Sequence, residues 1–224
     1  MAILEKAIQE KAEFLSEWEA KQLLSEYGIP VTADRLVKTA DEAAAAAEEI
    51  GFPVVLKGCG RSLLHKTELD AVKLNLKNAD QVREAAEDVL SRLPEDADGL
   101  LVGPMVDARR EFLAGVTQDQ QFGPVVAFGL GGIFTETIKD VAFRVAPFEP
   151  AEGLALISDV AASRLMNAVR GLPAIDRNLF ATLLSNLSKL AAQNSAIDEI
   201  DCNPVLADGE KPVVVDALVK LKYE

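Results

Sequence analysis

Near its C-terminal end the chain carries a row of oxygen-bearing side chains on a segment with the pattern of a β-strand. Because neighbouring side chains of a strand point to opposite faces, Glu199, Asp201 and Asn203 share one face. Ile200 and Cys202 then share the other face. Strands are poor in Asp and Asn, so this row is unusual and marks a candidate binding site.

A further acid closes the next predicted strand. Asp216 follows three valines, and a hairpin that turns at 207–211 lets Asn203 approach Asp216. Hard oxygen ligands without histidine or thiolate suit Mg²⁺, which takes a few protein oxygens and completes its shell with phosphate and water. The alternative interpretation is an edge strand with a solvated acidic face, followed by an Asn-Pro turn. The residues alone leave both interpretations open.

Two other features could contact phosphate. Lys57 ends an apolar strand predicted at 52–57, where its ammonium could present a point charge. Glycines at 129–132 separate apolar runs at 124–128 and 133–138, which predicts a hairpin with a glycine tip whose amides could approach phosphate oxygens. The simpler interpretations are a lysine that marks where its strand leaves the core, and an ordinary turn that matches neither the Walker loop nor the Rossmann fingerprint. Together with the oxygen row, these features would hold a Mg-nucleotide.

The single histidine lies in a polar segment between two predicted strands. An exposed imidazole at His65, close in sequence to the carboxylate of Glu68, could act as a base or as a phosphoryl acceptor. The alternative is an inert surface histidine. With one histidine and two scattered cysteines, Cys59 and Cys202, the sequence supports no Ser-His-Asp or Cys-His arrangement.

Composition limits the class of protein. The 224 residues are 49% hydrophobic and 26% charged, which is typical of a globular chain and excludes global disorder. Lys and Arg number 23 against 36 Asp and Glu, a net charge of −13 that repels polyanions and argues against nucleic-acid binding. Two cysteines suggest a reducing compartment, and we find no signal peptide and no apolar run long enough to span a membrane. We therefore expect a cytoplasmic protein.

Capping signals and apolar periodicity define the elements that must position these residues. Capping-box spacing occurs at Ser16 with Glu19 and at Thr39 with Glu42. We predict helices at 16–28, 39–51, 80–92, 150–169 with a break near 158, and 176–193. We predict strands at 52–57, 71–76, 100–102, 112–116, 124–128, 133–138, 197–202 and 212–217. The order is mixed and contains hairpins, so it favours an α+β fold over a doubly wound sheet.

Several of these motifs, in this order, resemble the beta subunits of ADP-forming acetate–CoA ligases, in the acyl-CoA synthetase (NDP-forming) group of the ATP-grasp superfamily. The most specific stretch is Phe-Gly-Pro-Val-Val-Ala-Phe-Gly-Leu-Gly-Gly-Ile-Phe-Thr-Glu at 122–136, continued by Lys-Asp-Val-Ala-Phe-Arg at 139–144. Beside it are Pro-Val-Val-Leu-Lys at 53–57, His-Lys-Thr-Glu at 65–68, and Asp-Cys-Asn-Pro at 201–204 with Val-Val-Asp at 214–216. The similarity spans nearly the whole chain.

The resemblance implies an ATP-grasp fold, in which two α+β subdomains grip a nucleotide, ADP or ATP. The subdomains would cover about 20–102 and 103–224, with the N-terminal helix packed on the second. The residues that the resemblance assigns to nucleotide and metal are Lys57 for phosphate, Val102 and Met105 for the adenine hinge, Glu111 for the ribose, Gly131 and Gly132 for the glycine tip, and Asn203 and Asp216 for Mg²⁺.

The resemblance also implies a reaction and a partner. A CoA-binding alpha subunit would form an acyl phosphate and then a phosphohistidine, and its phosphoryl group would pass to Mg-ADP. His65 would be a second, transient carrier oriented by Glu68, and Arg144 would add positive charge. The net reaction would be acyl-CoA + ADP + phosphate ⇌ carboxylic acid + CoA + ATP, catalysed by a hetero-oligomer. The alternatives are a non-catalytic, nucleotide-sensing or regulatory subunit with the same fold, and a different ligase that uses a bound acid.

Three positions depart from the pattern of the resemblance. Leu69-Asp70-Ala71 replaces a segment that usually contains two glycines, which would change the freedom of the histidine segment. Gly103 stands where Gln or Glu is usual, and Leu218 stands where an arginine is usual.

Overall fold

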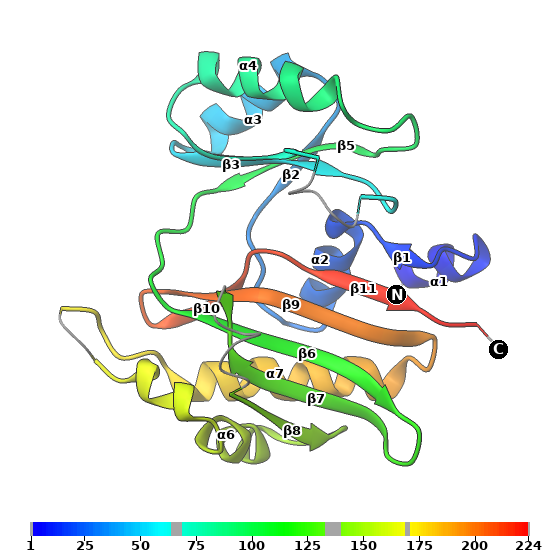
Figure 1. The fold of residues 1–224 in the computed structure, drawn as a ribbon, viewed down its shortest axis with the longest axis vertical. Helices are drawn as coiled ribbons and strands as arrows, with labels where there is room; N and C mark the ends of the chain where they lie inside the picture. Colours follow the sequence, from blue (N-terminus) through cyan, green and yellow to red (C-terminus); the bar gives the residue numbers. More distant parts are fainter. Residues whose placement is uncertain (1, 64–68, 133–139, 169–170, 224) are drawn as a thin grey trace. The chain divides into compact units, whose positions relative to one another are not determined.

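The computed structural model describes residues 2–63, 69–132, 140–168 and 171–223, and the chain divides into two compact units (Figure 1). The large unit consists of Met1–Glu13, Ala20–Val31 and Val106–Glu224. The small unit consists of Phe14–Glu19 and Thr32–Met105. The chain therefore passes from the small unit to the large unit after Met105.

The small unit is an antiparallel sheet with helices on one face (Figure 1). Its strands, in spatial order, are β2 (Arg35–Val37), β5 (Gly99–Pro104), β3 (Val54–Cys59) and β4 (Val72–Leu76). The covering helices are α3 (Ala40–Ile50) and α4 (Ala79–Leu90), and β1 (Phe14–Leu15) also belongs to this unit. Alanines of α3 pack with Val54, Leu56 and Val102 of the sheet, all fully buried.

The predicted capping residues begin the helices of this unit. Thr39 accepts a hydrogen bond from the Glu42 amide at 3.2 Å, and the Glu42 carboxylate accepts one from the Thr39 amide at 3.2 Å. The Asn78 side chain caps α4 in the same way. Helix α2 (Glu17–Glu26) begins after Ser16, whose amide donates to the Glu19 carboxylate at 3.0 Å. These helix starts are therefore confirmed.

The large unit is built on a longer antiparallel sheet with helices α6 (Pro150–Ser158) and α7 (Arg177–Gln193) on one face (Figure 1). Its strands, in spatial order, are β11 (Leu218–Leu221), β9 (Ile197–Asp208), β6 (Glu111–Asp119), β7 (Gly123–Leu130) and β8 (Val141–Val145). Strand β10 (Lys211–Val214) pairs with the other end of β9. Helix α1 (Ala2–Gln9) and the 3₁₀ helix η2 (Ala161–Met166) complete this unit.

An aromatic cluster fixes which face of this sheet is the core. Phe112 of β6, Phe128 of β7 and Phe180 of α7 are fully buried, with ring centroids 5.2 to 5.8 Å apart. Since side chains alternate along a strand, the neighbours of these residues point to the opposite face, where Phe143 of β8 is 54% exposed. The sheet therefore has one helix-covered face and one open face.

Two predictions about elements need correction. The predicted glycine tip at 129–132 begins too early, because β7 continues through Gly129 to Leu130 and Gly129 is opposite Val141 of β8. A Cβ at Gly129 would lie 2.4 Å from the Asp140 carbonyl oxygen, so this glycine permits a close strand approach. The predicted strand at 133–138 lies outside the described residues. In the helix predicted at 150–169, the break expected near 158 is confirmed, since α6 ends at Ser158, but the segment after the break forms the 3₁₀ helix η2 and not a continued α-helix.

Among the described residues, no helix is long and apolar enough to cross a bilayer.

Replacing Phe180 by alanine should lower the free energy of unfolding by about 3–5 kcal/mol, because it removes a ring that packs against two others in the core. The neighbouring Leu179 is 41% exposed, so Leu179→Ala is a matched control that should change it by less than about 1 kcal/mol. Urea denaturation of the two variants measures both values. Equal effects would contradict the placement of the core.

Candidate functional site

The oxygen row lies on the open face of the large-unit sheet. Glu199, Asp201 and Asn203 line a hollow of about 550 Å³ on this face. Ile200 and Cys202 are buried on the other face, so the alternation predicted from the sequence is confirmed. On β6, Gly115 is opposite Asp201, and the hollow also contains Phe143. Because Gly115 has no side chain, its strand position leaves room beside the Asp201 carboxylate.

The strand register places Asp216 beside this row. Strand β10 pairs with β9 through Val214 opposite Val205, and the Val215 amide donates to the Pro204 carbonyl at 3.3 Å. Beyond the break, Leu218 of β11 is opposite Asp201 in the same register, which places Asp216 opposite Asn203. The predicted hairpin is therefore present, and it brings these two residues together near the middle of β9.

The carboxylates of this group repel one another. Burial, followed by the charges of Glu199 and Asp216, raises the pKa of Asp201 to about 6. A cation that bound here would relieve this repulsion. Among the described residues no group of three or more His, Cys, Asp or Glu side chains is arranged to hold a metal ion by itself. Mg²⁺ needs few protein oxygens when phosphate and water supply the others, so Asn203 and Asp216, with Asp201 beside them, could hold it, and their role as metal ligands stays a prediction.

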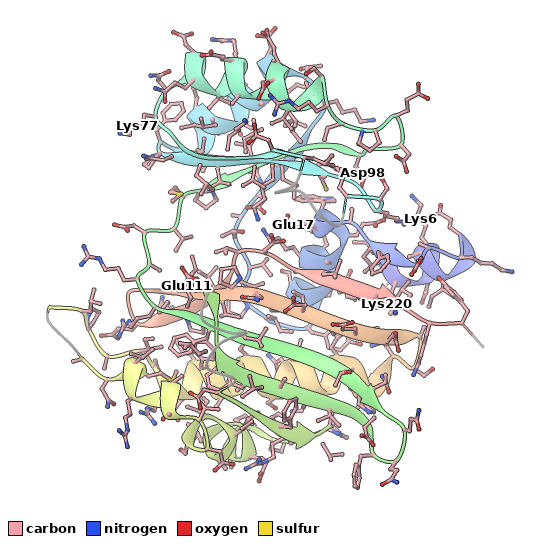
Figure 2. The ribbon with its side chains drawn as sticks, in the orientation of Figure 1. Lys6, Glu17, Lys77, Asp98, Glu111 and Lys220 are labelled. Carbon is pink, nitrogen blue, oxygen red and sulfur yellow. The ribbon has the colours of Figure 1, made fainter. Side chains whose placement is uncertain are left out.

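A second group of predicted residues gathers where β6 begins. The Gly131 amide donates to the Glu111 carbonyl at 3.0 Å, and a Cβ at Gly132 would lie 2.5 Å from a carboxylate oxygen of Glu111. Figure 2 labels Glu111 at this end of β6. Glu111 is opposite Leu206 on β9, three residues from Asn203, or about 10 Å along the strand. Glu111, Gly131 and Gly132 therefore lie at the same end of the sheet as the oxygen row.

In the small unit, Lys57 is held by a buried carboxylate. Its Nζ atom lies 2.8 Å from Oε1 of Glu17, the first residue of α2. The Glu17 side chain is 1% exposed and that of Lys57 is 14% exposed. Lys57 points to the face of the sheet opposite α3 and α4, since its neighbour Leu56 packs in the core beneath these helices. The lysine is thus fixed on the face of the sheet opposite α3 and α4.

The predicted hinge residues lie at the end of β5. Val102 is fully buried between β2 and β3, and the Met105 amide donates to the Pro53 carbonyl at 3.1 Å. At Gly103, a Cβ would lie 2.1 Å from the Asp34 carboxylate. Asp34 therefore occupies the space that a side chain at position 103 would need, which explains how the sequence tolerates this departure.

Arg144 is not brought together with the oxygen row. It is opposite Val126 on β7, which is fully buried, whereas Phe143 faces the hollow. The Arg144 guanidinium binds the carboxylates of Glu152 at 2.6 Å and Asp159 at 2.5 Å, and these hydrogen bonds raise its pKa. The structure gives Arg144 a role in tying β8 to α6, and its predicted role toward phosphate stays a prediction.

The predicted catalytic residues His65 and Glu68 lie outside the described residues. The chain on either side of them is anchored. Before them, Arg61 binds Glu19 at 2.6 Å. After them, Asp70 binds Lys73 at 2.6 Å and Arg92 at 2.7 Å, and both hydrogen bonds lower the pKa of Asp70.

Comparison with known proteins decides the family. The family model described as ATP-grasp domain matches residues 6–221. The chain belongs to the ATP-grasp family. It is 38% identical over 230 residues to the acetate–CoA ligase [ADP-forming] II subunit beta of Pyrococcus furiosus, covering 99% of this chain and 98% of that protein. The α+β ATP-grasp fold and the resemblance to these beta subunits are thereby confirmed.

Solved structures agree with this assignment. The chain is similar to the dinucleotide forming acetyl-coenzyme A synthetase 1 of Ca. Korarchaeum cryptofilum in complex with coenzyme A and Ca-AMPCP, with a TM-score of 0.93, 38% identity and 99% of each chain covered. Another structure of that synthetase contains Mg-AMPPCP, with its phosphohistidine segment pointing towards the nucleotide binding site. Its TM-score to this chain is 0.88, at 37% identity over 99% of each chain.

Sequence reasoning missed Glu17 and Asp34 in this ATP-grasp chain. Glu17 follows the helix-capping Ser16, so its position suggests only a favourable interaction with the helix N-terminus. Its partner is 40 residues away, and only the fold brings the two together. The sequence signal for Asp34 is indirect, since a glycine at position 103 implies that another group fills the space where a side chain would lie.

Replacing Glu17 by glutamine should lower the free energy of unfolding by about 3 kcal/mol, because it leaves the charge of Lys57 without its buried counter-ion. The exposed pair of Glu149 and Lys189 provides the matched variant Glu149→Gln, which should cost at most about 1 kcal/mol. The double variant Glu17→Gln/Lys57→Met should recover part of the loss. Urea unfolding that ranked the two glutamine variants equally would contradict a stabilising buried pair.

The raised pKa of Asp201 predicts how metal-free stability depends on pH. The folded chain retains this proton up to about pH 6, whereas an unfolded chain releases it near 3.8, so stability should fall as pH rises from about 4 to 6 and then level off. The loss attributable to Asp201 is up to about 3 kcal/mol. The free energy of unfolding should be measured in EDTA as a function of pH. Asp201→Asn should remove this part of its pH dependence, and Asp198→Asn should retain it. An unchanged slope in Asp201→Asn would refute the prediction.

Proposed function

We propose that this chain is the nucleotide-binding subunit of an ADP-forming acyl-CoA synthetase of the acetate–CoA ligase type. The observation that carries the proposal is the group of Asp201, Asn203 and Asp216 on the open face of the large-unit sheet. The carboxylates of Asp201 and Asp216 repel one another beside the Asn203 amide, and this set of oxygens suits a cation that also holds phosphate. Relatives of matching length support it, since they are beta subunits of ADP-forming ligases.

Each predicted residue has a role toward Mg-ADP in this proposal. Asn203 and Asp216, assisted by Asp201, hold Mg²⁺, which neutralises phosphate charge when it is bound. Lys57 contacts the phosphates, and Glu111 accepts a hydrogen bond from the ribose. Gly132 leaves room beside the Glu111 carboxylate, which a Cβ there would approach to 2.5 Å, and Gly131 lets the chain approach the Phe112 backbone closely.

In this proposal the backbone groups of the hinge residues Val102 and Met105 form hydrogen bonds with the adenine base. Because the Met105 amide already donates to Pro53, its carbonyl is the group available to an exocyclic amine. Val102 keeps the end of β5 in place through its burial.

The reaction is phosphoryl transfer from a phosphohistidine of a CoA-binding alpha subunit to ADP. In the first transfer a ring nitrogen of His65 attacks the phosphorus of the partner's phosphohistidine, and that P–N bond breaks as the new one forms. In the second transfer an oxygen of the ADP β-phosphate attacks the phosphorus held by His65, the P–N bond breaks as the P–O bond forms, and the electron pair returns to the imidazole nitrogen. Glu68 orients the His65 ring. Positioning and charge neutralisation supply most of the catalysis in such a transfer. In the similar synthetase a phosphohistidine segment points towards the nucleotide binding site, which supports this role for a partner.

A second function, nucleotide sensing without catalysis, is favoured by one observation. Asp70 adopts a φ of 51° where relatives of this type usually have glycine, and it is tied by ion pairs to Lys73 and Arg92. An anchored segment next to His65 would suit a chain that binds nucleotide but no longer transfers a phosphoryl group.

The proposal is tested by mixing the chain with a phosphorylated CoA-binding subunit and Mg-ADP, and measuring ATP by luciferase. We expect ATP only when all three are present, and no acyl-CoA turnover by the chain alone. Asp216→Ala should reduce the rate by about a hundredfold or more, the scale for losing one group that stabilises transition-state charge. Asp198→Asn, which removes a charge from β9 outside the oxygen row, should leave the rate unchanged.

His65→Ala separates the two functions. Loss of ATP formation with retained Mg-ADP binding supports the enzyme. Nucleotide binding by the wild-type chain without any ATP formation would favour the sensing subunit, and ATP formation by Asp216→Ala at the wild-type rate would refute the proposed metal site.

A further inference from the structure

The strand that carries Asp216 is interrupted where Asp216 lies. Strand β10 pairs with one end of β9 and β11 with the other, and residues 215–217 between them belong to neither strand. In this break the Val215 amide still donates to Pro204. The Val215 carbonyl accepts a hydrogen bond from Nζ of Lys21 at 2.8 Å. Lys21 thus holds the backbone of the residue that directly precedes Asp216.

Lys21 is a buried cation. It lies in the part of α2 that belongs to the large unit, and its side chain is only 1% exposed. Removing an ammonium group from water is costly unless nearby groups compensate its charge. A neutral donor would satisfy a backbone carbonyl equally well, so the use of a lysine requires a further reason.

The nearby negative charges provide this reason. Asp216 directly follows the residue that Lys21 binds, and the pairing of β10 and β11 with β9 places Asp216 opposite Asn203, two residues from Asp201. The Lys21 ammonium therefore lies close to the carboxylates of the oxygen row. The ammonium compensates part of the negative charge of the oxygen row and at the same time holds the break in the strand.

We infer that Lys21 is a positioning residue of the metal and nucleotide site: its hydrogen bond to the Val215 carbonyl fixes the backbone that presents Asp216 beside Asn203. The inference rests on the proposed function, since it concerns the same site. Neither the motifs nor the oxygen row assigns Lys21 a role in it. Partners that orient metal ligands typically change metal affinity by 10- to 100-fold when they are removed.

If Lys21 acted through its charge alone, its removal would change metal affinity in the opposite direction. A cation near a metal site repels the metal, so its removal should strengthen metal binding if charge were its only effect. Loss of positioning should weaken binding. The sign of the change therefore distinguishes the two roles.

The experiment measures binding of Mn²⁺·ADP to the full chain, with Mn²⁺ followed by electron paramagnetic resonance and the dissociation constant obtained by titration. We expect Lys21→Met to weaken binding about tenfold or more, while affinity for metal-free ADP changes less than threefold. The matched control is Lys220→Met on β11, which removes the same charge from the ion pair with Asp198. Its dissociation constant should stay within about twofold of wild type.

A folded Lys21→Met chain that binds Mn²⁺·ADP as tightly as wild type, or more tightly, overturns the inference. The fluorescence of Trp18 and the unfolding temperature report whether the variant is folded. If it is not, Lys21→Arg decides, because arginine keeps the donor and the charge: affinity within threefold of wild type supports the inference, and a tenfold loss in the folded variant overturns it. If the wild-type chain fails to bind Mn²⁺·ADP, the proposed function itself fails and the inference with it.

Discussion

Alternation of side chains on β9 is the constraint on which the candidate site depends. Ile200 and Cys202 are needed in the core beneath the sheet, so Asp201 and Asn203 must point to the open face. Register then places Asp216 beside them, and partial burial makes the charges repel. The carboxylates on and beside this strand therefore repel one another, and a bound cation would relieve that repulsion. A fold without a ligand here would be more stable with neutral side chains, which is why the row indicates binding.

The positions of Arg144 and Lys57 show which of these positive charges could bind a phosphate. Arg144 is bound to two carboxylates on the helix-covered face, so the sheet itself separates it from the oxygen row. Lys57 binds the buried carboxylate of Glu17 and lies on the face of its sheet opposite α3 and α4. A lysine held in this way is fixed in position. In a chain with a net charge of −13, such fixed local charges and a metal ion are what allow a polyanionic ligand to bind.

Local signals predicted much of this structure, and long-range contacts account for what they missed. Helix starts at Thr39 and Asn78 depend on residues three positions apart, so the sequence contains the whole motif. Gly129 was misinterpreted because a glycine that permits a close strand approach looks the same in sequence as one in a turn. Glu17 was missed because its partner lies far along the chain. The oxygen row could be predicted because its geometry follows from strand periodicity and one hairpin.

The departures from the family pattern are local exchanges that the fold compensates. At Gly103 a side chain is lost, and the Asp34 carboxylate occupies its space, so an acidic or polar group is still present next to the end of β5. At Asp70 the freedom of glycine is lost, but aspartate tolerates a positive φ better than most residues and gains ion pairs in return. At position 103 the Asp34 carboxylate thus takes the space of the missing side chain, and at position 70 ion pairs take the place of backbone freedom. Such compensation is expected where a chain retains its binding site while the mobility of one segment or the selectivity of the hinge changes.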